Sequence, residues 1–295
     1  MKALENRKIQ ISLSTPPDHL KLGIPPRELD RALLSVCMAL VRAGATVVYG
    51  GDLRPDGFSF KIFRHLARAY ADSNSVPFIH IIDYVSLAKM TYEILENALT
   101  ERRGTCVTYV CVENTLSPVW LGDDEIIVGD QASSTSLQKD PAFTEWVSGL
   151  KHLPQAEEMT ASRKVKAEFA DACVAIGGKM GLVGNGADLS AGAMPGIFEE
   201  SLLMLKGGKP LIPLGAYGGA TRDMAIALDL LGDDEKVPRG KQVDSYNVAL
   251  EDLASCKTLI PQRVYPKLKS LAKDDRAEIL ARDAVDTIKD WLAER

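Results

Sequence analysis

Apolar and polar residues alternate along the chain with two different periods, and each period predicts one type of element. Residues 8–14 (KIQISLS) alternate with period two, which is typical of a β-strand, and the Thr-Pro-Pro that follows ends it. From Pro26 onward the apolar side chains recur at spacings of four, three and four, which predicts an amphipathic helix. The residues of this apolar face are Leu29, Leu33, Val36 and Leu40.

The same patterns recur over most of the chain. Further strands are predicted at 45–49, 76–84, 106–113, 172–176 and 209–214. Helices are predicted at 60–72, 86–99, 163–171, 197–206 and 221–231. Strands that alternate with helices in this way indicate a parallel sheet with helices on both faces. The sequence therefore predicts an α/β fold, a doubly wound, Rossmann-like parallel sheet with helical additions at the C-terminus.

The domain organisation follows from where this alternation weakens. Residues 1–232 are expected to form one Rossmann-like domain, and residues 233–295 are expected to add helices, at 242–255 and 275–293, packed on the same domain. Within the first range, residues 114–158 look like an insertion that contains one helix at 141–150.

Composition excludes several classes of protein. Of the 295 residues 46% are hydrophobic, which excludes disorder for most of the chain. A net charge of -5 argues against a nucleic-acid-binding protein, and no apolar run approaches the ~20 residues that span a bilayer. The charged residues near the start do not suit a signal peptide, and the five cysteines form no Cys-x-x-Cys pair. We therefore expect a cytoplasmic protein with reduced thiols and no membrane partner.

Candidate chemistry is concentrated where the predicted strands end, because ligands of open α/β sheets lie at the carboxyl ends of the strands. Ser12 and Ser14 stand at the end of the first strand, and three glycine pairs follow later ones. The pairs are Gly50–Gly51, Gly177–Gly178 and Gly218–Gly219. Glycine amides let a backbone approach phosphate oxygens, although any single pair is more simply explained as a tight turn. Together the three pairs favour a phosphate-bearing ligand.

The standard nucleotide motifs are absent from the sequence. It contains no G-x-x-x-x-G-K-[ST] run and no G-x-G-x-x-G, so neither a kinase-type phosphate loop nor an ordinary dinucleotide fold is supported. The four histidines are scattered without metal-ligand spacing, so no metal site is expected, and no cofactor is predicted.

Charged residues flank the later glycines. Arg163 and Lys164 lie on the helix that leads into the strand at 172–176, and Lys179 follows Gly178. Glu199 and Glu200 begin the helix after Gly196. Arg163 and Lys164 would be explained by a solvated helix face. Glu199 and Glu200 would be explained by an acidic first turn that matches the helix dipole. Neither explains why an 18-residue glycine-rich run, 179–196, separates the lysine from the two glutamates.

These residues resemble a known family. The runs MTASRKVKAEFADACVAIGGK (159–179) and PGIFEESLLMLKGGKPLIPLGAYGG (195–219) are similar to the SLOG superfamily, and the resemblance extends over 8–60 and 159–225. That group includes the LOG phosphoribohydrolases, which cleave cytokinin riboside monophosphates, DprA-type proteins, and the sensor domains of Thoeris antiviral effectors. Gly50–Gly51 with Gly57 resembles the earlier glycine loop of the LOG enzymes.

The resemblance implies two sets of roles. Similarity to the LOG enzymes implies an N-glycosidase in which Arg163, Glu199 and Glu200 are catalytic. The chain departs from that pattern because no proline precedes Gly177, Gly196–Ile197 replaces the enzymes' Gly-Thr, and residues 179–195 are inserted. Similarity to the Thoeris sensors, which also place a lysine after Gly-Gly, implies binding of an ADP-ribose derivative without turnover.

Physical roles can also be assigned to these residues without the resemblance. Arg163 suits bidentate binding of a phosphate and Lys179 would add a second positive charge, with the glycine amides of residues 50–51 and 177–178 completing the cradle. Glu199 or Glu200 would accept hydrogen bonds from ribose hydroxyls, with Glu199 expected to contribute more.

Two functions therefore remain open, a cytosolic sensor of a nucleotide-derived ligand in a defence or signalling pathway and a nucleoside 5'-monophosphate N-glycosidase. The lysine after Gly178 and the missing Gly-Thr favour the sensor, whereas the lack of an attached effector domain favours the enzyme. A sensor without an effector domain has to act through a partner protein or by oligomerising, so we expect a homo-oligomer or an effector partner and no nucleic-acid partner.

Overall fold

A computed structural model describes most of the chain, and the described residues form two compact units. The described residues are 2–51, 57–70, 76–101, 104–112, 114–130, 132–190 and 192–294. The first unit combines residues 1–45 with 167–295, and the second comprises 46–166. The sequence predicted a boundary at residue 232 instead, and that boundary stays a prediction.

The first unit is built on three parallel strands. They are β1 (Lys8–Ser14), β8 (Ala172–Gly177) and β9 (Leu211–Leu214), with β8 between the other two. The register places Ser12 beside Ala175 and Ser14 beside Gly177. All six residues of β8 are buried, as expected of a central strand in a parallel sheet. The carboxyl ends of the three strands therefore lie at one edge, followed by the loops that carry the predicted glycines.

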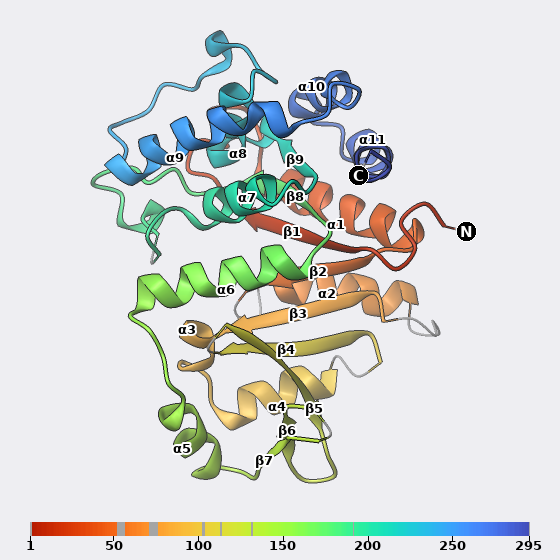
Figure 1. Ribbon diagram of the computed structural model, residues 1–295, viewed down its shortest axis with the longest axis vertical. Helices are drawn as coiled ribbons and strands as arrows, with labels where there is room; N and C mark the ends of the chain where they lie inside the picture. Colours follow the sequence, from red (N-terminus) through yellow and green to blue (C-terminus); the bar gives the residue numbers. More distant parts are fainter. Residues whose placement is uncertain are drawn as a thin grey trace. The chain divides into compact units, whose positions relative to one another are not determined.

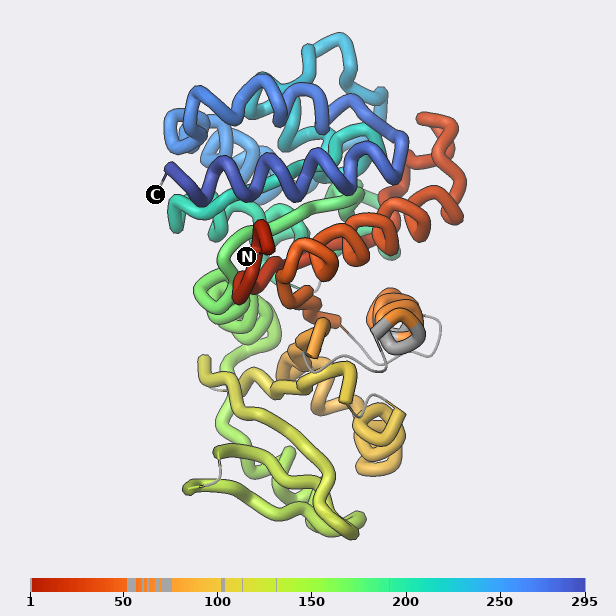
Figure 2. Tube along the Cα trace, turned by 90° about the vertical axis from the view of Figure 1, so that its right-hand side faces the viewer, coloured from red at the N-terminus to blue at the C-terminus, as the bar shows by residue number. Residues whose placement is uncertain are grey.

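Helices surround these strands (Figure 1). The α-helices of this unit are α1 (Pro26–Arg42), α7 (Gly196–Lys206), α8 (Gly219–Ala227), α9 (Asp244–Ser255), α10 (Tyr265–Lys273) and α11 (Ala277–Leu292). Helices α7 and α8 pack on β8 and β9, and α10 packs on β9. Helix α1 begins with a proline in its first turn and buries its apolar face, and α11 runs along it (Figure 2).

The second unit contains parallel and antiparallel strands. The strands β2 (Thr46–Gly50), β3 (Phe78–Asp83) and β4 (Cys106–Val112) are parallel. The strands β5 (Thr115–Leu121), β6 (Ile126–Val128) and β7 (Thr135–Leu137) continue from β4 as an antiparallel ribbon. The α-helices are α2 (Phe58–Tyr70), α3 (Tyr84–Leu87), α4 (Tyr92–Glu101), α5 (Ala142–Gly149) and α6 (Gln155–Phe169).

The α/β, Rossmann-like fold that the sequence predicts is confirmed, because parallel strands alternate with helices in both units. Several elements differ in detail. The region 114–158 holds the β5–β7 ribbon in addition to the predicted helix, and the helix predicted at 86–99 is divided into α3 and α4. Helix α6 begins at Gln155, directly after Pro154, eight residues before the predicted start. Residues 71–72 and 113, predicted as helix and strand ends, lie outside the described residues.

Two further findings concern the remaining predictions. The C-terminal region contains α10 in addition to the two predicted helices, and all of 233–295 falls in the first unit. Across the described part of the chain, every helix is too short or too polar to cross a membrane.

Candidate functional site

The first strand of the first unit positions a glutamate of α7 through its polar side chains. The Ser12 hydroxyl donates a hydrogen bond to Oε2 of Glu200, and Nε2 of Gln10 donates to the Ser12 hydroxyl oxygen over 3.1 Å. Gln10 and Ser12 are two residues apart on β1 and therefore point to the same face of the sheet. Both are buried, whereas Glu200 is half-buried. The pair holds the Glu200 carboxylate in a defined orientation.

This arrangement refines two sequence predictions. Ser14 is the last residue of β1, as predicted, but Ser12 lies two residues inside the strand, where its hydroxyl donates to Glu200. Glu199, which the sequence favoured over its neighbour, is 5% exposed. Gln10 was missed, although it occupies the same alternating polar positions of the strand as Ser12 and Ser14.

The two later glycine pairs pack against one another and against the segment after β1. Gly177, Gly178, Gly218 and Gly219 all have positive φ, from +63° to +109°. A Cβ on Gly219 would lie 2.4 Å from the carbonyl oxygen of Gly178, and one on Gly177 would lie 2.5 Å from the carbonyl oxygen of Ser14. Any larger residue would therefore push two backbone segments apart.

The backbone amides of these pairs have partners within the protein. The amide of Gly178 donates to the Ser14 carbonyl over 2.9 Å, and that of Gly218 donates to the Gly215 carbonyl over 3.1 Å. The amide of Gly219 donates to Oδ1 of Asp18 over 2.8 Å. These contacts support the interpretation as tight turns, and the role of both pairs in phosphate binding stays a prediction.

Asp18 is a buried carboxyl group that the sequence did not single out. It is 3% exposed, and its second oxygen, Oδ2, is buried without a hydrogen-bond partner among the described residues. Burial raises the pKa of the Asp18 carboxyl above 3.8, and the Gly219 amide and the charge of Arg239 offset part of this effect. Asp18 thus joins the segment after β1 to the start of α8.

The glycine-rich run between β8 and α7 is organised by a buried aspartate. Asp188 accepts hydrogen bonds from the amides of Met180, over 3.0 Å, and Leu182, over 2.8 Å. Lys179, predicted as the second positive charge at a phosphate, donates to the Leu189 carbonyl oxygen over 2.9 Å. This contact gives Lys179 a structural role within its own loop. Gly196 is the first residue of α7, directly after Pro195.

In the second unit, the glycine pair at the end of β2 lies against polar side chains. A Cβ on Gly50 would lie 2.7 Å from Nζ of Lys166, and one on Gly51 would lie 3.1 Å from the Ser59 hydroxyl. Nε2 of His80, which is fully buried, lies 3.0 Å from the carbonyl oxygen of Gly51. His80 is therefore a buried core residue whose ring nitrogen contacts a backbone carbonyl oxygen.

Helix α6 carries three positively charged side chains in its middle, and two of them are buried. Arg163 is 5% exposed and Lys166 is 7% exposed, whereas Lys164 is exposed to solvent. Residues three apart on a helix share a face, so Arg163 and Lys166 lie together and Lys164 points elsewhere. The sequence named the adjacent Arg-Lys pair and missed Lys166, for which the three-residue spacing was the available signal.

The structure therefore divides the predicted residues between the units. Gly50, Gly51, Arg163 and Lys164 belong to the second unit, and the remaining predicted residues belong to the first. That both groups serve one ligand stays a prediction.

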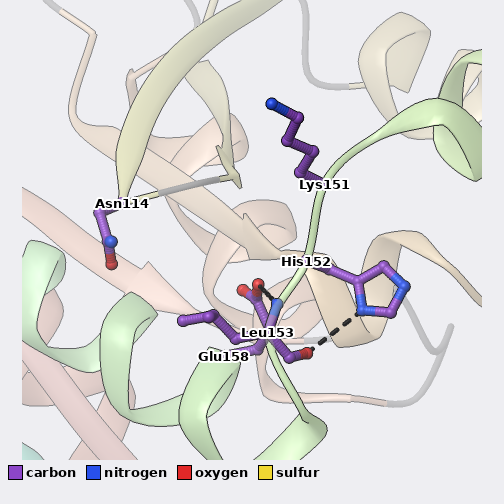
Figure 3. A pocket seen from close by; sticks show the side chains of 5 residues that line it. All are labelled: Asn114, Lys151, His152, Leu153 and Glu158. Carbon is purple, nitrogen blue, oxygen red and sulfur yellow. Dashed lines mark hydrogen bonds between the residues drawn. The ribbon is translucent and has the colours of Figure 1, made fainter.

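Two surface pockets are lined by other residues. The first, of about 200 Å³, is lined by Asn114, Lys151, His152, Leu153 and Glu158 (Figure 3). There the buried Glu158 carboxylate accepts a hydrogen bond from the Leu153 amide over 2.6 Å, and the His152 ring stacks on Tyr84. The second, of about 270 Å³, lies where α1 and α11 begin and includes the Arg31–Glu278 ion pair. Neither pocket contains a residue that the sequence predicted for the site.

Comparison with known proteins assigns the chain to a family. Residues 3–275 match the family model described as SLOG cluster2. No curated protein is significantly similar to the chain. In the part of the chain that the structure describes, no group of three or more His, Cys, Asp or Glu residues is placed to hold a metal ion.

Proposed function

Because the chain belongs to the SLOG family, whose model covers residues 3–275, we propose that it binds a nucleotide-derived ligand and senses it without consuming it. The ligand class is an ADP-ribose derivative or a nucleoside phosphate. The SLOG family itself suggests nucleotide-related binding or glycosidase-like activity. The preference for a sensor depends on the start of α7.

The observation that carries this preference is the side chain of Ile197. The LOG enzymes that the chain resembles have threonine after the glycine at this point, and a threonine would supply a hydroxyl. Ile197 is 7% exposed, and its Cβ lies 3.4 Å from the position of a Cβ built on Gly178. An apolar side chain therefore packs against the turn after β8 where the enzymes have a hydrogen-bonding group.

The Glu200 carboxylate fits a binding role. Ser12 donates to one of its oxygens, which orients the group, and an oriented carboxylate can accept hydrogen bonds from the hydroxyls of a ribose. Arg163 and Lys166 supply positive charge for a phosphate in the second unit. These groups bind and orient a nucleotide, and none of them has to change its covalent state for the ligand to be recognised.

The alternative is a nucleoside 5'-monophosphate N-glycosidase. It is favoured by the consecutive Glu199 and Glu200 at the start of α7. In that case one carboxylate would stabilise the cationic sugar of the transition state and orient the attacking water.

A pair of variants separates the two functions. Wild type, Glu200→Gln and Glu199→Gln are incubated with nucleoside monophosphates, NAD and cyclic ADP-ribose isomers, and thermal shift and base release are followed together. A bound ligand raises the unfolding free energy by RT ln(1 + [L]/Kd), about 2.7 kcal/mol at a hundredfold excess over Kd. We expect stabilisation without base release, with Glu200→Gln weakening binding modestly and more than Glu199→Gln, because glutamine keeps one acceptor oxygen.

An enzyme gives the opposite pattern. Base release by wild type that falls about 100-fold or more in Glu200→Gln, at unchanged affinity, would falsify the sensor proposal.

A further inference from the structure

The pocket shown in Figure 3 lies where two parallel strands of the second unit end. Asn114 comes two residues after the end of β4, and His152 stacks on Tyr84, the residue directly after β3. Glu158 lies in the first turn of α6. Ligands of open α/β sheets bind outside the carboxyl ends of the strands. A pocket of about 200 Å³ at this edge therefore lies where a ligand of this unit is expected.

Glu158 is the buried charged residue of this pocket. It is 6% exposed, and its Oε1 accepts a hydrogen bond from the Leu153 amide over 2.6 Å. Its other oxygen, Oε2, has no hydrogen-bond partner among the described residues, and none of their cations forms an ion pair with it. A carboxylate accepts roughly four hydrogen bonds, so Glu158 retains most of its accepting capacity.

The structural role of Glu158 explains only part of this arrangement. Its bond to Leu153 fastens the segment before α6 to the first turn of that helix, where the helix dipole also favours a carboxylate. These contacts use one of the two oxygens. Burying a carboxylate is costly unless donors or a cation offset the loss of water. The second oxygen therefore favours a ligand that brings positive charge and N–H donors.

The other walls of the pocket suit a cation with an aliphatic stem. Leu153 is 44% exposed and offers an apolar surface, on which methylene groups can pack. Asn114 offers a side-chain oxygen that accepts hydrogen bonds. Lys151 brings a like charge, but it is exposed and its side chain extends away from the Glu158 carboxylate (Figure 3).

We infer that this pocket binds an alkylguanidinium group, which donates to Glu158 and Asn114 and packs its methylene groups on Leu153. A guanidinium carries five donors in a planar fork that matches a carboxylate, and it is more weakly hydrated than an ammonium. An arginine side chain of another protein and a free alkylguanidine present this same chemistry. The inference is independent of the proposed function, because none of the residues proposed to bind the nucleotide lines this pocket.

The test titrates three probes into ¹⁵N-labelled protein and follows the resonance of the Leu153 amide, which donates to Glu158. Butylguanidine represents a small molecule, and a blocked tripeptide with a central arginine represents a protein partner. The same tripeptide with citrulline in place of arginine is the uncharged isostere. We expect at least one charged probe to give a saturable shift, and the citrulline peptide to bind about 10-fold more weakly than the arginine peptide or not at all. The tighter of the two charged probes identifies the source of the group.

Two adjacent glutamates supply the matched variants. Glu158→Gln removes the charge but keeps an oxygen for the Leu153 amide, so the fold should be retained. Glu157→Gln removes the same charge from an exposed position in the same helical turn. We expect Glu158→Gln to weaken binding of the charged probes about 10- to 100-fold, because a hydrogen bond to a charged group is lost. Glu157→Gln should leave their affinity unchanged.

A further variant adds charge to the pocket. Asn114 has φ of +60°, a conformation that aspartate also adopts, so Asn114→Asp should fold. It places a second carboxylate in the pocket and should tighten binding of the charged probes. This variant decides the question if Glu158→Gln fails to fold.

Four results overturn the inference. They are no saturable shift of the Leu153 amide with either charged probe at millimolar concentration, equal affinity for the arginine and citrulline peptides, equal losses in Glu158→Gln and Glu157→Gln, and unchanged or weaker binding by Asn114→Asp. None of these results bears on nucleotide binding, so failure of the inference and failure of the proposed function are distinguishable.

Discussion

Asp18 is a buried residue, and burial raises the pKa of its carboxyl group. One oxygen of this carboxyl accepts from the amide of Gly219, and the other is buried without a partner among the described residues. Desolvation is the largest cause of the raised pKa of Asp18. In the unfolded chain the carboxyl titrates near 3.8. The folded state therefore retains the proton to a higher pH than the unfolded state does.

This difference predicts a pH-dependent stability. The contribution of Asp18 is fully present below pH 3.8 and is lost as the pH rises through its raised pKa. Asp18→Asn removes the titration but keeps an acceptor for Gly219. We expect the unfolding free energy of Asp18→Asn, relative to wild type, to increase from pH 4 to pH 7 in urea titrations.

The control for this prediction is Asp123→Asn, which removes one negative charge from an exposed position. A difference between Asp18→Asn and wild type that stays constant with pH, or one that shrinks toward pH 7, contradicts the account of Asp18.

Single residues also show what could be predicted at the site. Residue types near the strand ends and at helix starts led us to predict the glycine pairs, Arg163 and the two glutamates, and these assignments stay predictions. Two further contacts were not predicted, that of Gln10 with Ser12, which holds Glu200, and that of Lys166 with Gly50. These contacts depend on the position of β1 and on the rotation of α6 about its axis. Local spacing marks Gln10 and Lys166 as candidates, but it does not encode the register or the rotation that decides which groups they contact.

Among the elements, α8 depends most on a glycine. Gly219 is its first residue, has φ of +63° and lies so close to Gly178 that a Cβ would meet the carbonyl oxygen of Gly178 at 2.4 Å. Gly219→Ala should therefore lower the unfolding free energy by roughly 2–4 kcal/mol, since it combines backbone strain with a steric clash.

Gly240→Ala is the matched control, because Gly240 has no positive φ and no atom within 4 Å of a built Cβ. Urea denaturation of both variants gives the comparison. A Gly219→Ala protein as stable as Gly240→Ala would mean that the two glycine pairs do not pack as described.

Elements with a strong period were predicted well, and those with a weak one were not. The alternation in 8–14 and the apolar face of α1 match β1 and α1 closely. Strands β6 and β7 have three residues each, and β5 contains Pro118, so no period develops. Helix α6 carries the polar residues Glu158, Arg163 and Lys166 on its buried side, which conceals the apolar stripe that marks most helices.

For the whole molecule, the alternation of strands and helices was sufficient to predict an α/β fold, which the structure and the family match confirm. The division into two compact units was not predicted, because it depends on contacts between residues far apart in the sequence, such as those that join β1 to β8. Local periodicity carries no information about such contacts.

The central claim, that the protein binds a nucleotide-derived ligand and leaves it intact, is tested most directly by recovering the ligand from the complex. Protein in excess over AMP, ADP-ribose, NAD or a cyclic ADP-ribose isomer is separated from free ligand by gel filtration, denatured, and its bound nucleotide identified by chromatography. We predict that at least one of these compounds elutes with the protein and is recovered unchanged. Recovery of free base and ribose phosphate in its place, or elution of every compound apart from the protein, would contradict the claim.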